Sequence, residues 1–135
     1  MAGFFTDYAN NKVLDLVFGS AAFSPPATLY LGLSQGVANK GGYPTEPASG
    51  GYARVPLANN FTSFPAATGG TKSNAAVATF PTPSADWGTI QSLFIADASS
   101  GGNVIAMADL SVPKSITSGG VAAKVAVGAL FLSHT

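Results

Sequence analysis

The sequence of 135 residues contains no cysteine, a single histidine and few charged side chains, which make up 9% of the chain. Without cysteine there is no disulfide framework and no thiolate metal site. With one histidine, carboxylates would have to supply most ligands of a zinc ion, which is uncommon. We therefore predict that the protein binds no metal and no cofactor.

Groups with catalytic chemistry are equally sparse. The histidine, His134, is the second-to-last residue, and chain ends usually fray. The six acidic residues lie singly along the chain. Glycine pairs such as Gly69-Gly70, which precede Thr71-Lys72-Ser73, lack the full phosphate-loop pattern and a following helix. Two carboxylates that are distant in sequence could still meet as in a glycoside hydrolase, but we predict no catalytic residue and no enzymatic activity.

The balance of charge excludes further classes. Six basic and six acidic side chains cancel, so the chain lacks the basic face that nucleic-acid binding requires. No run of 18 apolar residues could span a bilayer. The N-terminus lacks the basic region of a secretory signal, so we expect synthesis in the cytoplasm and no membrane partner. A net charge of zero gives little repulsion between copies and favours association.

Residues 6–18 have the pattern of a helix. Thr6 is a suitable N-cap, and Asp7 in the first turn complements the helix dipole. Apolar residues recur at helical spacing: Ala9, Val13, Leu14, Leu16, Val17 and Phe18. Gly19 stands where a C′ glycine commonly ends a helix.

From about residue 27 to 133 the chain has the pattern of β-structure, with short apolar segments between turns rich in Gly, Pro and Ser. The predicted strands cover residues 28–33, 52–57, 75–80, 89–96, 103–110 and 121–132. Pro56 removes a hydrogen-bond donor and favours an edge position. This pattern predicts a single domain, residues 1–135, that is mainly β: an antiparallel β-sandwich or barrel with one N-terminal α-helix.

Aromatic residues supply the candidate contacts with other proteins. Phe4 and Phe5 either staple the helix to the domain or insert into a neighbouring subunit. Residues 34–51 read as a long surface loop, a kind of segment that often carries function. Tyr43 in this loop packs there or contacts a partner, whereas Trp87 is expected in the core. Our predicted interface residues are therefore Phe4, Phe5 and Tyr43.

The order of several short motifs resembles a family of small structural proteins of tailed bacteriophages, often labelled tail-fibre-like. The motifs are Phe5-Thr6-Asp7-Tyr8-Ala9-Asn10-Asn11-Lys12-Val13-Leu14-Asp15, Ala27-Thr28-Leu29-Tyr30-Leu31-Gly32-Leu33-Ser34, Glu46-Pro47, Gly50-Gly51-Tyr52-Ala53-Arg54-Val55, Asp86-Trp87-Gly88-Thr89-Ile90 and Gly101-Gly102-Asn103. Together they cover nearly the whole chain. The resemblance implies a virion component and provides no active-site residue to transfer.

Low charge, an apolar N-terminal flank and long loops favour one role in the virion. We predict a capsid decoration (cement) protein that stabilises the shell as a symmetric homo-oligomer, with the major capsid protein as partner and a trimer as the expected state. The alternative is a tail-fibre or tail-associated receptor-binding domain, which would present Tyr43 and residues 34–51 to a host glycan.

Overall fold

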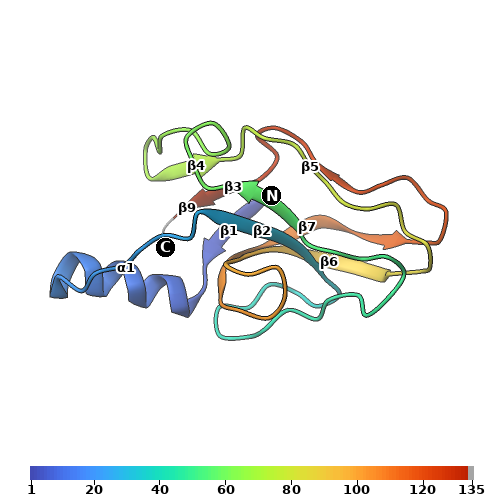
Figure 1. Cartoon of the computed structure of the whole chain (residues 1–135), viewed down its shortest axis with the longest axis horizontal. Helices are drawn as coiled ribbons and strands as arrows, with labels where there is room; N and C mark the ends of the chain where they lie inside the picture. The colour runs from blue at the N-terminus through green and yellow to red at the C-terminus, as the bar shows by residue number, and fades with distance from the viewer. Residues whose placement is uncertain (134–135) are drawn as a thin grey trace.

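A computed structural model describes residues 1–133, in which nine strands and one helix form a mainly β domain (Figure 1). The elements in chain order are β1 (Ala2–Phe5), α1 (Asp7–Gly19), β2 (Thr28–Ser34), β3 (Val55–Ala58), β4 (Thr71–Ser73), β5 (Ala78–Thr79), β6 (Gly88–Ala96), β7 (Val104–Ile116), β8 (Lys124–Val125) and β9 (Phe131–Ser133). The predicted combination of β-structure with an N-terminal helix is confirmed.

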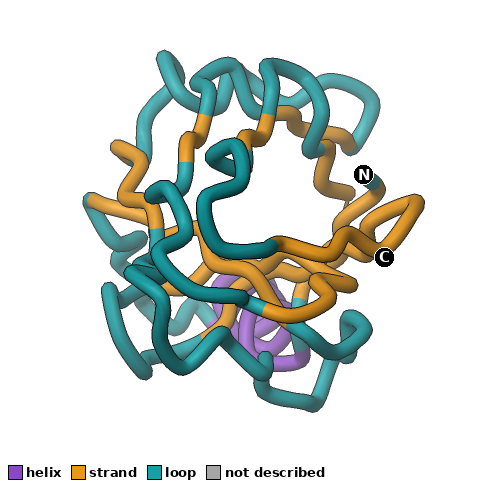
Figure 2. Tube along the Cα trace, turned by 90° about the vertical axis from the view of Figure 1, so that its right-hand side faces the viewer, coloured by secondary structure: helices purple, strands orange, loops and turns teal. Residues whose placement is uncertain are grey.

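Seven strands form one curled sheet in the order β3-β2-β6-β7-β1-β9-β4, and β5 pairs with β8 in a second, two-stranded sheet. Figure 2 shows the larger sheet bending round into a half-barrel. The sheet is mixed, not purely antiparallel as predicted, because β1 runs parallel to β9. The predicted edge position of Pro56 is correct, since β3 is the first strand of the sheet.

β6 and β7 form an antiparallel hairpin, as the sequence predicts, and they lie in the interior of the seven-stranded sheet. Bulky apolar residues at alternate positions of β6, such as Leu93 and Ile95, point into the core and are at most 3% exposed. Trp87, just before β6, is 1% exposed, and its indole N–H donates to the carbonyl of Gly50 at 2.9 Å. The prediction that Trp87 belongs to the core is therefore confirmed.

The start of α1 is confirmed and its end is displaced by one residue. The Thr6 side chain caps the helix by accepting the N–H of Ala9, and its hydroxyl donates to the carbonyl of Val104 on β7. Gly19 is the last helical residue, and it is Ser20 that adopts the left-handed conformation, with φ 53°. The prediction that Gly19 lies at the C′ position beyond the helix is wrong, because the helix includes Gly19 and the cap residue is Ser20.

The predicted strand at residues 121–132 is wrong. The segment forms two short strands, β8 and β9, with a turn between them at Gly128. Asn74, which is 1% exposed, holds this turn: its carbonyl Oδ1 accepts the N–H of Leu130 at 3.0 Å, and its Nδ2 donates to the carbonyl of Ala126 at 2.9 Å. A buried side chain from another part of the chain thus overrides the local alternation of apolar residues.

Candidate functional site

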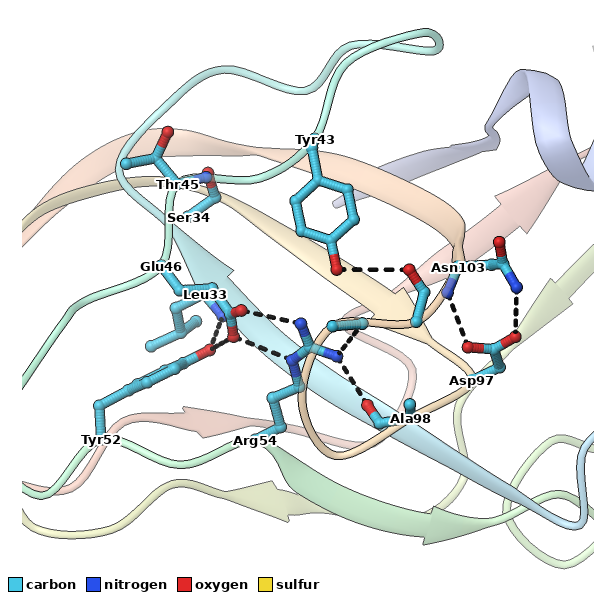
Figure 3. A network of polar contacts seen from close by, with 12 residues as sticks. Leu33, Ser34, Tyr43, Thr45, Glu46, Tyr52, Arg54, Asp97, Ala98 and Asn103 are labelled. Atoms are coloured by element: carbon cyan, nitrogen blue, oxygen red, sulfur yellow. Dashed lines mark hydrogen bonds and ion pairs between the residues drawn. The ribbon is translucent and has the colours of Figure 1, made fainter.

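The long loop between β2 and β3 is held in shape by an ion pair between two of its own residues (Figure 3). Arg54, at the end of the loop, donates from Nε to Oε1 of Glu46 at 2.9 Å and from Nη2 to Oε2 at 2.8 Å. The two parallel hydrogen bonds match the planar guanidinium to the carboxylate, the geometry in which this pair is strongest. We call Glu46, Tyr52 and Arg54 the loop clamp.

Arg54 also joins the loop to the turn between β6 and β7. Its Nη1 donates to the carbonyls of Ala98 and Gly101, at 2.6 and 3.0 Å. The guanidinium lies 5.0 Å from the centre of the Phe94 ring, a cation–π distance. Phe94 can lie there because Gly32, its cross-strand partner on β2, has no side chain: a Cβ on Gly32 would come within 2.2 Å of the ring.

Tyr52 is the third member of the loop clamp. Its hydroxyl donates to Oε1 of Glu46 at 2.7 Å and accepts the N–H of Leu33 on β2 at 2.9 Å. Burial and the hydrogen bond to the Glu46 carboxylate raise the pKa of Tyr52 above its ordinary value. The phenol therefore keeps its proton and serves as a fixed donor.

Glu46 and Arg54 each stabilise the charged form of the other. Partial burial acts to raise the pKa of Glu46, but hydrogen bonds from Arg54 and Tyr52, together with the positive charge of Arg54, outweigh it and lower the pKa. The hydrogen bond to Glu46 raises the pKa of Arg54. Both oxygens of Glu46 are engaged within the protein, so the clamp is arranged to hold a loop in place.

Tyr43 lies in the same loop, before the three clamp residues, and its side chain is 56% exposed. Its hydroxyl donates to the carbonyl of Gly102 at 3.4 Å. Neighbouring Asn103 is held by Asp97, whose carboxylate accepts the Asn103 N–H at 2.8 Å and its side-chain Nδ2 at 3.0 Å. A groove of about 310 Å³ lies between Tyr43, this turn and the start of α1.

Phe4 and Phe5 lie in β1, inside the sheet. Both rings are half-buried: Phe4 packs against a small cluster that contains Phe94 and Met107, and Phe5 packs against the main core. The two residues therefore contact the chain's own body, which was one of the two alternatives for them. Contact with another subunit stays a prediction for Phe4, Phe5 and Tyr43.

The helix presents an apolar surface that nothing in the described chain covers fully. Only Ala9 of α1 is buried. Leu14, Val17 and Phe18 are 48, 63 and 83% exposed. Apolar residues at helical spacing usually face a core, so the sequence pattern points here to a contact outside the domain.

Sequence reasoning missed the loop clamp. Glu46 and Arg54 appear in the sequence only as parts of short motifs, eight residues apart, and no local rule pairs residues at that distance in a loop. Their one signal is scarcity, since few charged residues exist and Arg54 is the one charged residue within the strand predicted at residues 52–57. The bidentate pairing depends on the fold of the whole loop.

Within residues 1–133 no three His, Cys, Asp or Glu side chains gather where they could hold a metal ion. In the same part of the chain, no helix has the length and apolar character to cross a membrane. His134, to which the sequence assigns no role, lies outside the described residues.

The exposed apolar surface of α1 is the kind of feature that marks a contact with another protein. Comparison with protein families agrees: the chain belongs to the family described as Podophage GP4 fiber I protein gp80, whose model matches residues 4–133. It is therefore a phage fibre structural protein, a virion component that associates with other virion proteins and is not an enzyme. No curated protein matches the chain in sequence.

Proposed function

We propose that this protein is a subunit of the tail fibre of its phage and acts there as a connector between protein subunits. The family to which the chain belongs is described as a fibre protein, which favours the alternative reached from the sequence over capsid decoration. A role in the tail fibre does not require the major capsid protein, which the sequence analysis predicts as the partner of a capsid decoration protein.

The exposed helix is the observation that carries the connecting role. In Figure 1, α1 projects at one end of the long axis of the molecule. Its first turn is anchored, because the N–H of Thr6 donates to the carbonyl of Ile105 and that of Asp7 to the carbonyl of Lys40. A helix that is rigidly attached at its start and apolar beyond it is suited to bind another protein.

The loop clamp supports the same role. It fixes residues 46–54 against β2 and the β6–β7 turn, so the loop that carries Tyr43 has a defined shape before any partner arrives. A preformed surface loses less conformational entropy on binding. Tyr43 is the proposed contact residue of this loop, because it is aromatic and more than half exposed.

Electron microscopy of intact particles with a gold-labelled antibody against this protein tests its position. The proposal expects gold at the tail. An antibody against the major capsid protein, applied to the same particles, serves as the control for head labelling. Gold spread over the head would overturn the proposal and restore the capsid decoration hypothesis.

A further inference from the structure

An apolar cavity of about 820 Å³ lies against the half-barrel, lined by residues of β6, β7 and β8 and of the segment before β8. Buried apolar side chains of the core, including Leu33, Phe80 and Leu93, line its inner wall. Its outer wall carries Val112 and Val121, which are 67 and 91% exposed. We call this space the half-barrel cavity. Soluble proteins rarely leave apolar side chains this exposed around a cavity unless something binds there.

The rim of the half-barrel cavity is basic. Lys114 on β7 and Lys124 on β8 both line it, and both side chains are exposed. Neither lysine forms an ion pair within the described part of the chain. An occupant should therefore be apolar in its centre and negative at its edge.

The end of α1 has this character. Leu14, Val17 and Phe18 occupy positions i, i+3 and i+4, which lie on one face of a helix, and Asp15 adds a carboxylate beside them. The carbonyl end of a helix carries a partial negative charge, and the last turn of α1 contains no basic residue to offset it. The C-terminal half of α1 is thus apolar on one face and negative at its tip.

We propose that α1 of one copy inserts into the half-barrel cavity of a second copy. Leu14, Val17 and Phe18 would fill the apolar space, and Lys114 and Lys124 would face Asp15 and the carbonyl end of the helix. This is the helix-in-groove mode of recognition, in which side chains at i, i+3 and i+4 act as anchors.

One molecule cannot make this contact with itself. Figure 1 places α1 at one end of the long axis, whereas the C-terminal end of β7, which lines the cavity, points toward the other. The contact is therefore head-to-tail between two copies. Such an interface builds a closed ring or an open filament, depending on the rotation between neighbours, and the net charge of zero opposes neither.

The competing arrangement is a symmetric pairing of two α1 helices through the same apolar face. It would bury Leu14, Val17 and Phe18 but leave the half-barrel cavity and its two lysines without a partner. The head-to-tail arrangement accounts for both features at once, and for this reason we favour it.

Two variants of the purified protein test the proposal. Phe18→Asp places a charge on the apolar face of α1 and leaves the half-barrel cavity unchanged. Val121→Asp places a charge in the lining of the half-barrel cavity and leaves α1 unchanged. Both side chains are more than 80% exposed, so neither change disturbs the core. Removing one buried anchor from an interface should weaken association at least about 10-fold, which analytical ultracentrifugation measures.

The mixture of the two variants gives the decisive result. The intact helix of the Val121→Asp protein can enter the intact cavity of the Phe18→Asp protein. The damaged cavity of the first and the damaged helix of the second remain free, and they cannot bind a third copy. We expect each variant alone to be largely monomeric and the equimolar mixture to form a one-to-one dimer. Phe61→Asp, at a site that is 71% exposed and belongs to neither surface, is the control and should associate like the original protein.

Three outcomes would overturn the proposal: a wild-type protein that stays monomeric up to about 1 mM, a mixture that forms no dimer, or a Val121→Asp protein that associates normally. The last result would indicate the symmetric helix pairing. The inference names a partner for the proposed fibre subunit, but its test uses purified protein. Failure here and failure of the antibody localisation are therefore distinguishable.

Discussion

At the scale of single residues, the position of the β2–β3 loop depends on Arg54 and its partner Glu46. The Arg54 side chain is 1% exposed, and that of Glu46 is 24% exposed. A charge at such depth needs a partner of opposite charge, and removal of one partner from a buried pair is strongly destabilising because it leaves the other charge without compensation. The clamp is therefore a site where a small change should have a large effect.

Replacing Glu46 by glutamine tests this dependence together with its pH profile. At pH 7 we expect Glu46→Gln to lower the free energy of unfolding by about 2–4 kcal/mol, because the buried guanidinium loses its counter-charge. The folded state lowers the pKa of Glu46, so its contribution to stability is present above the ordinary glutamate pKa of about 4.3 and is lost as the pH falls through the lower folded value.

The difference between the two proteins should therefore begin to shrink below about pH 4.3, where Glu46 of the unfolded chain takes up a proton, and it should disappear as the pH falls through the lower pKa of the folded state. Urea unfolding at a series of pH values measures it. Asp86→Asn is the matched control, because it also removes one carboxylate, at an exposed position where Asp86 accepts only the N–H of Ser118 in the described structure. A gap that stays constant down to pH 3 would contradict the pairing.

At the scale of elements, the sequence predicts best where a segment's own pattern decides its structure. The cap at Thr6, β2, and the hairpin of β6 and β7 all follow from local spacing and turn residues. The prediction of one strand at residues 121–132 is wrong because the side chain of Asn74, distant in sequence, supplies the hydrogen bonds of a turn there. The clamp is missed for the same reason, since its partners meet only after the long loop has folded.

The helix divides into an anchored start and an exposed end, and the two should respond differently to substitution. Thr6→Ala removes the helix cap and the bond from Thr6 to Val104, so we expect the free energy of unfolding to fall by about 1–2 kcal/mol. Phe18→Ser should change it by less than about 0.5 kcal/mol, because Phe18 is 83% exposed.

Thermal and urea unfolding measure both variants, at protein concentrations low enough to keep the chain monomeric. A large loss of stability in Phe18→Ser under these conditions would mean that the end of α1 packs against the chain's own domain. That result would remove the basis for treating the helix as a contact surface.

At the scale of the whole molecule, β1 joins the two halves of the curled sheet. It pairs with β7 on one side, where Gly3 faces Ala108, and with β9 on the other, where Gly3 faces Leu132. No sequence pattern predicts this, because the strand has only four residues and both partners are distant in the chain. Since β1 connects the β3-β2-β6-β7 part of the sheet to β9 and β4, a defect in β1 should weaken the entire domain.

Gly3→Val tests that role. A Cβ at Gly3 would lie 2.4 Å from a methyl group of Leu132 and 3.4 Å from the carbonyl oxygens of Met107 and Phe131, so a branched side chain forces its neighbours apart. Overpacking of this kind costs about 1–3 kcal/mol. The exposed neighbour Ala2 provides the control, since Ala2→Val adds bulk on the same strand without entering the interior.

Trp87 lies in the core directly before β6, so its fluorescence reports on the part of the sheet formed by β3, β2, β6 and β7. Far-ultraviolet circular dichroism reports on the whole backbone. Because β1 holds both halves in one cooperative unit, we expect Gly3→Val to shift both signals to lower urea together and Ala2→Val to shift neither. A Trp87 transition that stays in place while the circular dichroism signal moves would mean that the β3-β2-β6-β7 part of the sheet is stable without β1. The domain would then consist of two units that unfold separately.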